Sequence, residues 1–431
     1  MRKSITCAIA MMCMSLGVYA QSGTNSPYSQ YGLGVLSDQS QGRSRGMGGL
    51  AMGLRSNDQI NFLNPASYSA VDSLTMLFDV GLSGQITNFK EAGKRVNAKN
   101  ADFEYAVASF RALPRLGVSL GIVPFTNIGY DYESSYKEAA ANETYVTFYE
   151  SHEGSGGIHQ AFIGMGWNVW GGFSIGFNAS YLWGSYEKST SIESSDSYVN
   201  EITRTYVATV KSYKIDFGLQ FQTHVTPKDV LTLGATYTFG HNLNASAESQ
   251  MLNINSQTSV YTGDTVSVSD AFELPDIFSV GFALTHNDRL TIGFDYTFQK
   301  WGDMDFPETN DITGEYVMTS GLLKDMHKYT LGAEWVPNMQ SRKFLGRIRY
   351  RIGASYSTPY ITVNGLDGPK EYSISAGFGI PIVNNYNNRS LVNISAQWTH
   401  SSADELVSEN IFRINIGVTF NERWFMKWKV E

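Results

Sequence analysis

Cysteine is nearly absent from this sequence. Both cysteines, Cys7 and Cys13, lie within residues 1–20, which resemble a secretory signal peptide that ends in a small-residue cleavage site, Val18-Tyr19-Ala20. A lipoprotein processed at Cys13 is the alternative, but the flanking residues fit it poorly. The mature chain is expected to begin at Gln21 and to contain no cysteine, which excludes thiol catalysis, thiolate metal sites and disulfide bonds.

Long apolar runs and an excess of positive charge are also missing. No stretch of about eighteen apolar residues follows the leader, so a helical membrane protein is excluded. Loss of Arg2 and Lys3 with the leader leaves 30 basic against 40 acidic residues, a net charge of −10. Because the chain has no basic patch of the kind that binds nucleic acid, nucleic acid is not an expected partner.

Familiar catalytic motifs are lacking. The chain has no HExxH, GxSxG or phosphate-binding loop, and most of its seven histidines fall in expected loops, turns or strand ends. His159 is placed near a strand start and is interpreted as a rim residue. The acidic run from Asp303 to Asp311 could bind calcium, but it matches no EF-hand, and solvated loop charges are the commoner explanation. We therefore expect no enzyme activity, no cofactor and no metal.

The sequence does contain a strong period-two alternation of apolar and polar residues. It runs from Leu74 to Ile86 and recurs at 213–222, 290–299 and 412–420. The polar positions are rich in Gly, Ser, Thr, Asn and Gln and carry few charges. That composition suits a polar lumen, with the apolar face turned toward lipid.

Fourteen segments show this pattern, and each is long enough to cross a bilayer as a tilted strand. The even number predicts an all-β fold, a closed 14-stranded antiparallel transmembrane β-barrel. The segments are 74–87, 102–111, 115–132, 156–169, 172–188, 205–224, 229–247, 276–286, 289–300, 327–337, 345–357, 371–382, 389–400 and 410–420.

The links between these segments alternate in length. Those after even-numbered strands are short turns, and those after odd-numbered strands are mostly long, such as 133–155, 189–204 and 248–275. Periplasmic turns and extracellular loops of outer-membrane barrels differ in this way. Both termini are therefore expected on the periplasmic side of the outer membrane.

Tryptophans gather near the expected strand ends. An aromatic girdle at the membrane interfaces explains this placement, and ordinary strand propensity is the alternative. The six are Trp167, Trp170, Trp183, Trp301, Trp335 and Trp398.

Residues 21–73, ahead of the first strand, read as glycine-rich turns that are too apolar for a free tail. Because so wide a barrel leaves a lumen to fill or gate, we expect this segment to be a plug (hatch) in the lumen. A periplasmic extension is the alternative. The expected domains are thus a signal peptide 1–20, a plug 21–73, a barrel 74–420, and a basic, aromatic periplasmic tail 421–431 of unassigned role.

Several short motifs occur in a recognisable order. They are Arg45-Gly46-Met47-Gly48-Gly49, Asn64-Pro65-Ala66, Pro124-Phe125, residues 173–179 and Leu274-Pro275-Asp276. On these motifs the chain resembles the FadL/TodX family of outer-membrane transporters for long-chain fatty acids and other hydrophobic molecules. The resemblance covers most of the mature chain. It implies a hatch that carries Asn64, Pro65 and Ala66, ligand capture near the extracellular loops, and lateral exit beside a kinked third strand.

The third expected strand has an unusual proline. Of the eleven prolines, only Pro124 falls in the middle of an expected strand, and Gly121 and Gly129 flank it and the following Phe125. Proline lacks the N–H that a strand ladder needs. A local break in strand pairing is therefore expected. The family resemblance implies that this break is a lateral opening, and a harmless bulge is the alternative.

Charged residues on the polar faces are candidate lumen groups. Buried charges in a barrel usually find partners, so the arginines among them can pair with the acids. The plug arginines Arg43, Arg45 and Arg55 form no evident pair for a ligand carboxylate, and salt bridges within the hatch are the alternative. The candidate lumen charges are Asp79, Asp216, Asp295, Glu334, Arg349, Arg351 and Arg413.

Two hypotheses of function follow. The first is passive uptake of a hydrophobic small molecule across the outer membrane, through a plugged barrel with lateral exit and in contact with outer-membrane lipid. The second is a non-transporting interaction subunit on the same fold, such as a secretion-system shuttle or a structural protein. In either case the barrel assembly machinery is an expected partner during biogenesis.

Overall fold

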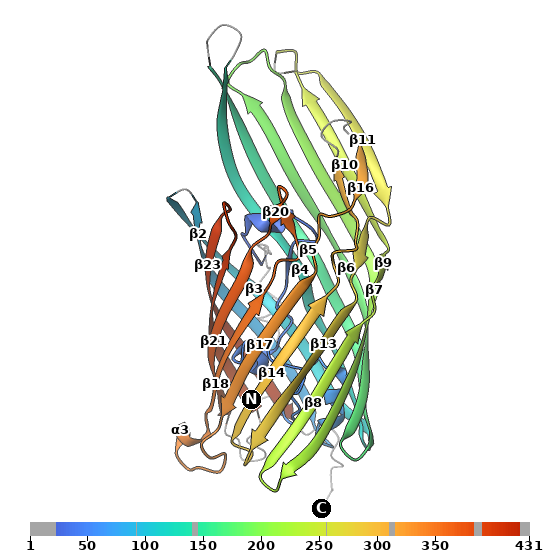
Figure 1. Cartoon of the computed structure of the whole chain (residues 1–431), viewed down its shortest axis with the longest axis vertical. Helices are drawn as coiled ribbons and strands as arrows, with labels where there is room; N and C mark the ends of the chain where they lie inside the picture. The colour runs from blue at the N-terminus through green and yellow to red at the C-terminus, as the bar shows by residue number, and fades with distance from the viewer. Residues whose placement is uncertain are drawn as a thin grey trace, which may run out of the picture.

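The computed structural model of the chain describes residues 23–91, 93–139, 145–255, 257–309, 315–382 and 390–422. Within them, fourteen antiparallel strand courses close into a barrel (Figure 1). The predicted fold class is confirmed. The expected signal peptide 1–20 and residues 423–431 of the expected tail lie outside the described residues. The other two tail residues, Asn421 and Glu422, belong to the last strand.

The first half of the barrel is built from long neighbouring strands. Each strand pairs with the next along the chain, as expected for an up-and-down barrel. The strands are β2 (Met76–Glu91), β3 (Lys94–Leu113), β4 (Leu116–Ala139), β5 (Tyr145–Trp170), β6 (Phe173–Ser194) and β7 (Glu201–Thr226).

The next two courses are interrupted. One consists of β8 (Asp229–Thr238), β9 (His241–Leu243) and β10 (Ala245–Ile254), and the other of β11 (Tyr261–Ser269), β12 (Phe272–Leu274) and β13 (Ile277–His286). Where they break, Pro275 has no N–H for the ladder, and the Asp276 carboxylate instead accepts a hydrogen bond from the Gly240 N–H at 2.9 Å. The motif Leu274-Pro275-Asp276 thus marks an interruption between β12 and β13.

The remaining strands complete the barrel. The final strand pairs with the first, from Met76↔Glu422 to Lys90↔Ser408, which closes the sheet. Short hairpins β15 (Phe306–Thr309) with β16 (Tyr316–Thr319) and β19 (Thr362–Val363) with β20 (Leu366–Asp367) lie in the loops. The barrel strands are β14 (Leu290–Gln299), β17 (Met326–Trp335), β18 (Arg349–Ser357), β21 (Lys370–Ile382), β22 (Ser390–Ser402) and β23 (Ser408–Glu422).

The two faces of the strands differ as the alternation predicts. On β2, Phe78, Leu82 and Ile86 are exposed on the outer face at 42%, 54% and 47%, whereas Asp79 and Gln85 are buried inside. Lipid would cover the outer side chains, and the closed ladder leaves no free backbone edge in the bilayer where it is continuous. No helix among the described residues is long and apolar enough to cross a membrane.

The predicted long loops 133–155, 189–204 and 248–275 are largely wrong. Strands β4 to β7, β10 and β11 continue through most of them and form a tall wall on one side of the barrel (Figure 1). On the outer face of β6, Tyr181 and Trp183 give way to Glu187 and Ser189. This change from aromatic to polar residues is what a strand needs when it leaves the bilayer for water. The predicted segment 172–188 ends there, whereas β6 continues to Ser194.

The expected aromatic girdle needs one correction. Trp167, Trp170, Trp335 and Trp398 are exposed on the outer surface, as a girdle requires. Trp301, in contrast, is 1% exposed and packs inside, with its ring centroid 5.0 Å from that of Tyr360. The residues just after strand β14 turn inward there, a course that strand periodicity does not predict.

Residues 23–73 run inside the barrel (Figure 1). Their elements are the short helices η1 (Pro27–Gln30), α2 (Gly42–Arg45) and η2 (Pro65–Ala70) and the two-residue strand β1 (Val35–Leu36). They share hydrophobic clusters with the barrel wall: Phe62, for example, stacks on Phe162 of β5 at 5.2 Å. A further helix, α3 (Phe344–Arg347), lies at the short-turn end, which in outer-membrane barrels faces the periplasm (Figure 1).

Candidate functional site

Arg45 is the most completely bonded side chain of the N-terminal segment. It is 2% exposed, and its guanidinium donates to a Glu104 carboxylate oxygen at 2.6 Å and to Asn415 Oδ1 at 2.9 Å. It also donates to the carbonyl oxygens of Ser40 and Asp38. Burial disfavours the charged forms, but the carboxylates of Glu104 and Asp38 raise the pKa of Arg45, and the Arg45 charge holds the pKa of Asp38 well below its usual range.

The glycines after Arg45 allow close contact with the wall. Gly48 has a φ of 72°, and a Cβ on it would lie 2.9 Å from the Ala354 backbone nitrogen. Its N–H donates to the Ser375 hydroxyl at 2.8 Å. Gly49 also has a positive φ, 92°, and a Cβ on Gly46 would press on the Arg351 side chain at 3.1 Å. Gly48 therefore fits against β18 only as a glycine or with strain, and Gly49 is favoured as a glycine by its positive φ alone.

Asn64, Pro65 and Ala66 form a junction between the N-terminal segment and the wall. The Asn64 side chain caps η2 by accepting from the Ala66 N–H at 3.2 Å. Its amide donates to the carbonyl oxygens of Met52 and Leu219 at 3.0 and 3.1 Å. Pro65 packs closely against Gly218 of β7: a Cβ atom on Gly218 would lie only 2.7 Å from the proline ring. The structure thus places all three residues at the wall, and their part in a hatch stays a prediction.

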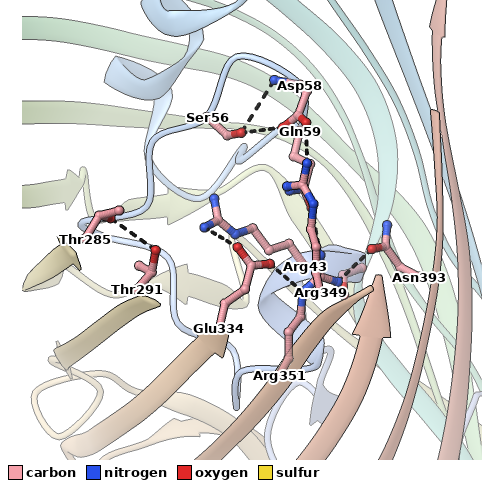
Figure 2. Close-up of polar contacts among 11 residues, drawn as sticks. Arg43, Ser56, Asp58, Gln59, Thr285, Thr291, Glu334, Arg349, Arg351 and Asn393 are labelled. Atoms are coloured by element: carbon pink, nitrogen blue, oxygen red, sulfur yellow. Dashed lines mark hydrogen bonds and ion pairs between the residues drawn. The ribbon is translucent and has the colours of Figure 1, made fainter. Parts of the chain in front are cut away.

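A cluster of buried arginines lies between α2 and the short-turn ends of β17 and β18 (Figure 2). One carboxylate oxygen of Glu334 forms an ion pair with Arg43 at 2.8 Å, and the other forms an ion pair with Arg351 at 2.7 Å. Arg351 also donates to Asn393 Oδ1 at 2.6 Å. One acid thus faces two guanidinium groups, and the trio carries a surplus positive charge.

Arg349 belongs to the same cluster but pairs with the N-terminal segment. Its guanidinium donates to an Asp58 carboxylate oxygen at 2.6 Å, and Asp58 also accepts from the Ser56 hydroxyl at 2.7 Å (Figure 2). Although burial opposes it, the Arg349 charge lowers the pKa of Asp58 below its ordinary value of 3.8. The pair therefore ties the turn at 55–58 to the barrel wall.

A pocket of about 510 Å³ opens beside this cluster at the short-turn end, and we call it the mouth pocket. Its charged lining residues are Arg43, Arg55, Asp58, Asp288, Arg289, Glu334, Arg347 and Arg349. A second cavity, of about 240 Å³ and here called the lumen cavity, lies farther up the barrel between residues 23–38 and the wall.

The predicted lumen charges are all placed inside, but with partners that were mostly not foreseen. Glu334 pairs with Arg351 as one of the expected combinations. Asp216 instead pairs with Lys214 at 2.5 Å, and Arg413 donates to Gln85 at 2.6 and 2.9 Å. Asp295 accepts the N–H groups of Ala51 and Met52, and Asp79 accepts from the Tyr105 hydroxyl at 3.4 Å.

Pro124 lies at a break in the strand ladder. The β4–β5 register shifts between Pro124 and Thr126, and the β3–β4 ladder ends at Ala106↔Ile122. Above that point, the described partner of β4 on this side is β1, with Val35↔Asn127 and Leu36↔Thr126. The N-terminal segment therefore lines the inner side of the β3–β4 seam.

The residues around Pro124 contact the same segment. The Phe125 carbonyl accepts from the Ser37 N–H at 3.0 Å, and the Gly129 N–H donates to the Ser29 hydroxyl at 3.1 Å. A Cβ on Gly121 would lie 2.7 Å from the Ala106 carbonyl oxygen, at the last rung of the β3–β4 ladder. Whether the seam opens laterally stays a prediction.

The described residues contain no candidate metal site. No group of three or more His, Cys, Asp or Glu residues in the described ranges is arranged to hold a metal ion. His159, expected at a rim, instead lies within β5, where it is exposed and its ring centroid is 5.8 Å from that of Trp183. The predicted strand began too late because β5 extends upward to Tyr145.

A protein-family model matches the whole chain, residues 1–431, and its description is BamG. The chain belongs to the BamG family. No curated protein matches its sequence.

Solved structures similar to this BamG-family chain have the same barrel. The Ralstonia pickettii toluene transporter TbuX has a TM-score of 0.62 at 15% identity, covering 93% of this chain and 99% of its own. The Pseudomonas putida toluene transporter TodX has a TM-score of 0.60 at 14% identity, covering 90% and 100%. A Pseudomonas aeruginosa FadL homologue has a TM-score of 0.61 at 12% identity, covering 88% and 98%.

These similarities confirm the predicted resemblance to the FadL/TodX family at the level of the fold. They also confirm the predicted location, because this 14-stranded barrel is an outer-membrane architecture of Gram-negative bacteria. Two of the structures named are toluene transporters. The BamG-family chain is accordingly an outer-membrane β-barrel.

Sequence reasoning missed two acids of the site, Asp58 and Glu104. Glu104 is the extra residue of a bulge, since Gly81 pairs with Tyr105 and the next residue, Leu82, pairs with Phe103. The bulge lets the adjacent Glu104 and Tyr105 both be buried, which strict alternation forbids. Nothing in the local sequence signals this bulge. Asp58 lies in a turn whose place in the lumen is set by the barrel around it.

Proposed function

We propose that this BamG-family protein is an outer-membrane interaction subunit, which holds a protein partner and does not pass a solute. The observation that carries the proposal is the number of charged side chains around its inner cavity. Apolar residues such as Tyr360 and Ile361 also line the lumen cavity of about 240 Å³, but they stand beside seven charged side chains. These are the acids Asp38, Asp102, Glu104, Glu371 and Glu409 and the bases Lys328 and Arg413. Sites for hydrophobic ligands are mostly apolar, and desolvating so many charges against one is costly.

The bonding of the N-terminal segment supports the same proposal. Arg45, Arg43 and Asp58 each make an ion pair with the barrel wall at 2.6 to 2.8 Å. Removing one partner from a buried ion pair costs about 3–5 kcal/mol, so moving the segment aside for each passing solute would be slow and unfavourable. A scaffold has no need for such movement.

Membership of the BamG family supports a setting in outer-membrane protein biogenesis. Every outer-membrane barrel meets the barrel assembly machinery while it is inserted. We propose a lasting association of this protein with that machinery, beyond the encounter that inserts it. The tall wall of β4 to β7, β10 and β11 offers a surface to proteins on the side of the long loops, and the mouth pocket offers one to proteins in the periplasm.

The test is quantitative affinity purification of the tagged, full-length protein from its own outer membrane in mild detergent. We expect subunits of the barrel assembly machinery in fixed stoichiometry with the bait. An unrelated outer-membrane barrel, tagged and extracted in the same way, is the control for transient encounters during insertion. Recovery of the bait alone, or of partners in the same low yield as the control, would contradict the proposal.

Uptake of hydrophobic compounds with lateral exit is a second candidate function. It is favoured by the end of the β3–β4 pairing at Ala106↔Ile122, beyond which β1 is the described partner of β4 on this side, and by the fold shared with two toluene transporters. A deletion strain scored for uptake of labelled aromatic and long-chain compounds tests it. This candidate predicts a loss of uptake that plasmid-borne wild type restores, whereas the subunit proposal predicts unchanged uptake.

A further inference from the structure

The mouth pocket is positively charged in a protein that is acidic overall. Its lining holds five arginines, Arg43, Arg55, Arg289, Arg347 and Arg349, against the acids Asp58, Asp288 and Glu334. The whole chain has a formal net charge of −8. Such a local reversal of charge at a concave surface attracts anions and is not needed to support the barrel.

Internal pairing leaves several of these arginines without a balancing charge. Glu334 is shared between Arg43 and Arg351, and Asp58 is taken by Arg349. Arg289 and Arg347 have no ion-pair partner among the residues that the structure describes. An anion in the pocket would therefore not have to displace an acid that is already in place.

Hydrogen-bond donors are also left over. The Nε atoms of Arg43 and Arg347 are buried, and neither has a hydrogen-bond partner in the described part of the chain. Arg55 donates only to neutral oxygens, those of Ala66, Gln220 and Ser69. Burial, together with the neighbouring charge of Arg111, lowers the pKa of Arg55 to about 10, as expected where positive charges are crowded.

The position of the pocket indicates where its ligand comes from. It is lined by the turn at 55–58, by Thr291 of β14, Glu334 of β17 and Arg349 of β18, and by residues of the short turn 336–347. A lipid of the surrounding bilayer is on the other side of the barrel wall. A protein segment in the periplasm can enter directly.

The rest of the lining suits a peptide. Val336, Met339 and Pro381 add apolar surface beside the arginines, and Phe344 and Leu345 of the adjoining turn are exposed at 52% and 66%. Guanidinium groups bind carboxylates through paired, charge-assisted hydrogen bonds. About 510 Å³ lies within the ordinary range of ligand sites.

We infer that the mouth pocket binds an acidic peptide segment of a periplasmic protein, with Asp or Glu carboxylates held by Arg289, Arg347, Arg43 and Arg55. This inference rests on the proposed function, since it specifies the chemistry by which the subunit recognises one of its partners.

The test uses purified, full-length protein in detergent and a fluorescein-labelled hexaglutamate peptide, with hexaglutamine of the same length as the neutral probe. Fluorescence anisotropy should report binding of hexaglutamate alone, weakened as salt rises from about 0.05 to 0.5 M. The double variant Arg289→Gln, Arg347→Gln should bind at least about tenfold more weakly, because two charge-assisted contacts are lost.

A matched control is offered by the same turn. Arg342 and Lys343 are exposed and do not line the pocket, so Arg342→Gln, Lys343→Gln removes the same charge and should leave affinity unchanged. Equal loss in both double variants, or equal binding of the two peptides to wild type, would overturn the inference. The comparison of peptides on wild type decides the matter even if a variant fails to fold.

Two further outcomes are distinguished. Binding of glycerol phosphate without binding of hexaglutamate would assign the pocket to phosphate and overturn the peptide inference. Because the peptide assay contains no partner protein, its failure leaves the co-purification result for the proposed function unaffected. If the inference holds, the Arg289→Gln, Arg347→Gln bait should also lose one periplasmic protein that the control bait retains.

Discussion

Several side chains of the interior find partners far away in the sequence. Asp79, Asp216 and Asp295 are predicted inside the barrel from strand parity alone, because alternate residues of a strand face the same way. Asp216 pairs with Lys214 on the same face of β7, but the partners of Asp79 and Asp295 could not be predicted. Asp295, for instance, accepts two backbone N–H groups from Ala51 and Met52, whose position depends on how the whole N-terminal segment folds within the lumen.

The ion pair between Arg45 and Glu104 should contribute strongly to stability. Glu104→Gln leaves the buried guanidinium of Arg45 without its charge partner, so we expect a loss of about 3–5 kcal/mol in the free energy of unfolding. Urea unfolding of the protein in detergent measures it. The matched control is Lys324→Gln, which breaks an exposed pair with Asp367 and should cost less than about 1 kcal/mol. Equal effects would show that Arg45 is adequately solvated.

Alanine substitutions at Gly48 and Gly49 distinguish the energetic cost of backbone strain from that of steric contact. Both have positive φ, but a Cβ on Gly48 would meet the Ala354 backbone at 2.9 Å, whereas the nearest atom to a Cβ on Gly49 is the flexible Lys328 Nζ at 3.9 Å. We expect Gly49→Ala to cost about 1 kcal/mol from φ alone and Gly48→Ala clearly more. Thermal unfolding of the two variants compares them. The reverse order would mean that the Gly48 contact is not present in solution.

Among the elements, the strands were the most predictable part. All fourteen predicted segments correspond to strand courses, because the contrast between lipid and lumen imposes alternation on every crossing. Prediction failed where that contrast ends. Above Trp183 the outer face of β6 becomes polar, and strand continuation no longer differs from loop in composition. Bulges such as the one at Glu104 were not predicted either, because a bulge depends on the pairing with the neighbouring strand and not on the local sequence.

The seam beside Pro124 offers a test at the scale of elements. Pro124→Thr restores a backbone N–H at the break and should favour regular pairing of β4 with its neighbours. If hydrophobic compounds leave through this seam, whole-cell uptake of a labelled compound should fall at unchanged expression. Phe125→Leu, which adds no N–H, is the control. Unchanged uptake in the Pro124→Thr strain would count against a lateral exit and favour the subunit proposal.

At the scale of the whole molecule, the N-terminal segment makes extensive contact with the barrel wall. Hydrophobic clusters and ion pairs connect residues 23–73 with strands on several sides of the wall. The apolar composition of the segment predicted that it would not be a free tail, but its path could not be foreseen because turns carry no periodic pattern. The segment fills space that a barrel of this width would otherwise leave to water.

Deleting residues 21–67 tests whether this segment closes the barrel. We expect the shortened protein to give open, ion-conducting channels in planar bilayers, whereas the full chain conducts little. Heat-dependent migration in gels checks that the shortened barrel still folds. A folded deletion variant with the conductance of the full chain would reject the plug.

The central claim is that this outer-membrane barrel holds a protein and does not carry a hydrophobic solute. Native mass spectrometry of the full-length protein, released gently from its own membrane, tests this most directly. The account predicts a peak for a defined complex with at least one other protein and a lumen free of bound small molecules. A monomer that retains a stoichiometric hydrophobic compound would contradict it.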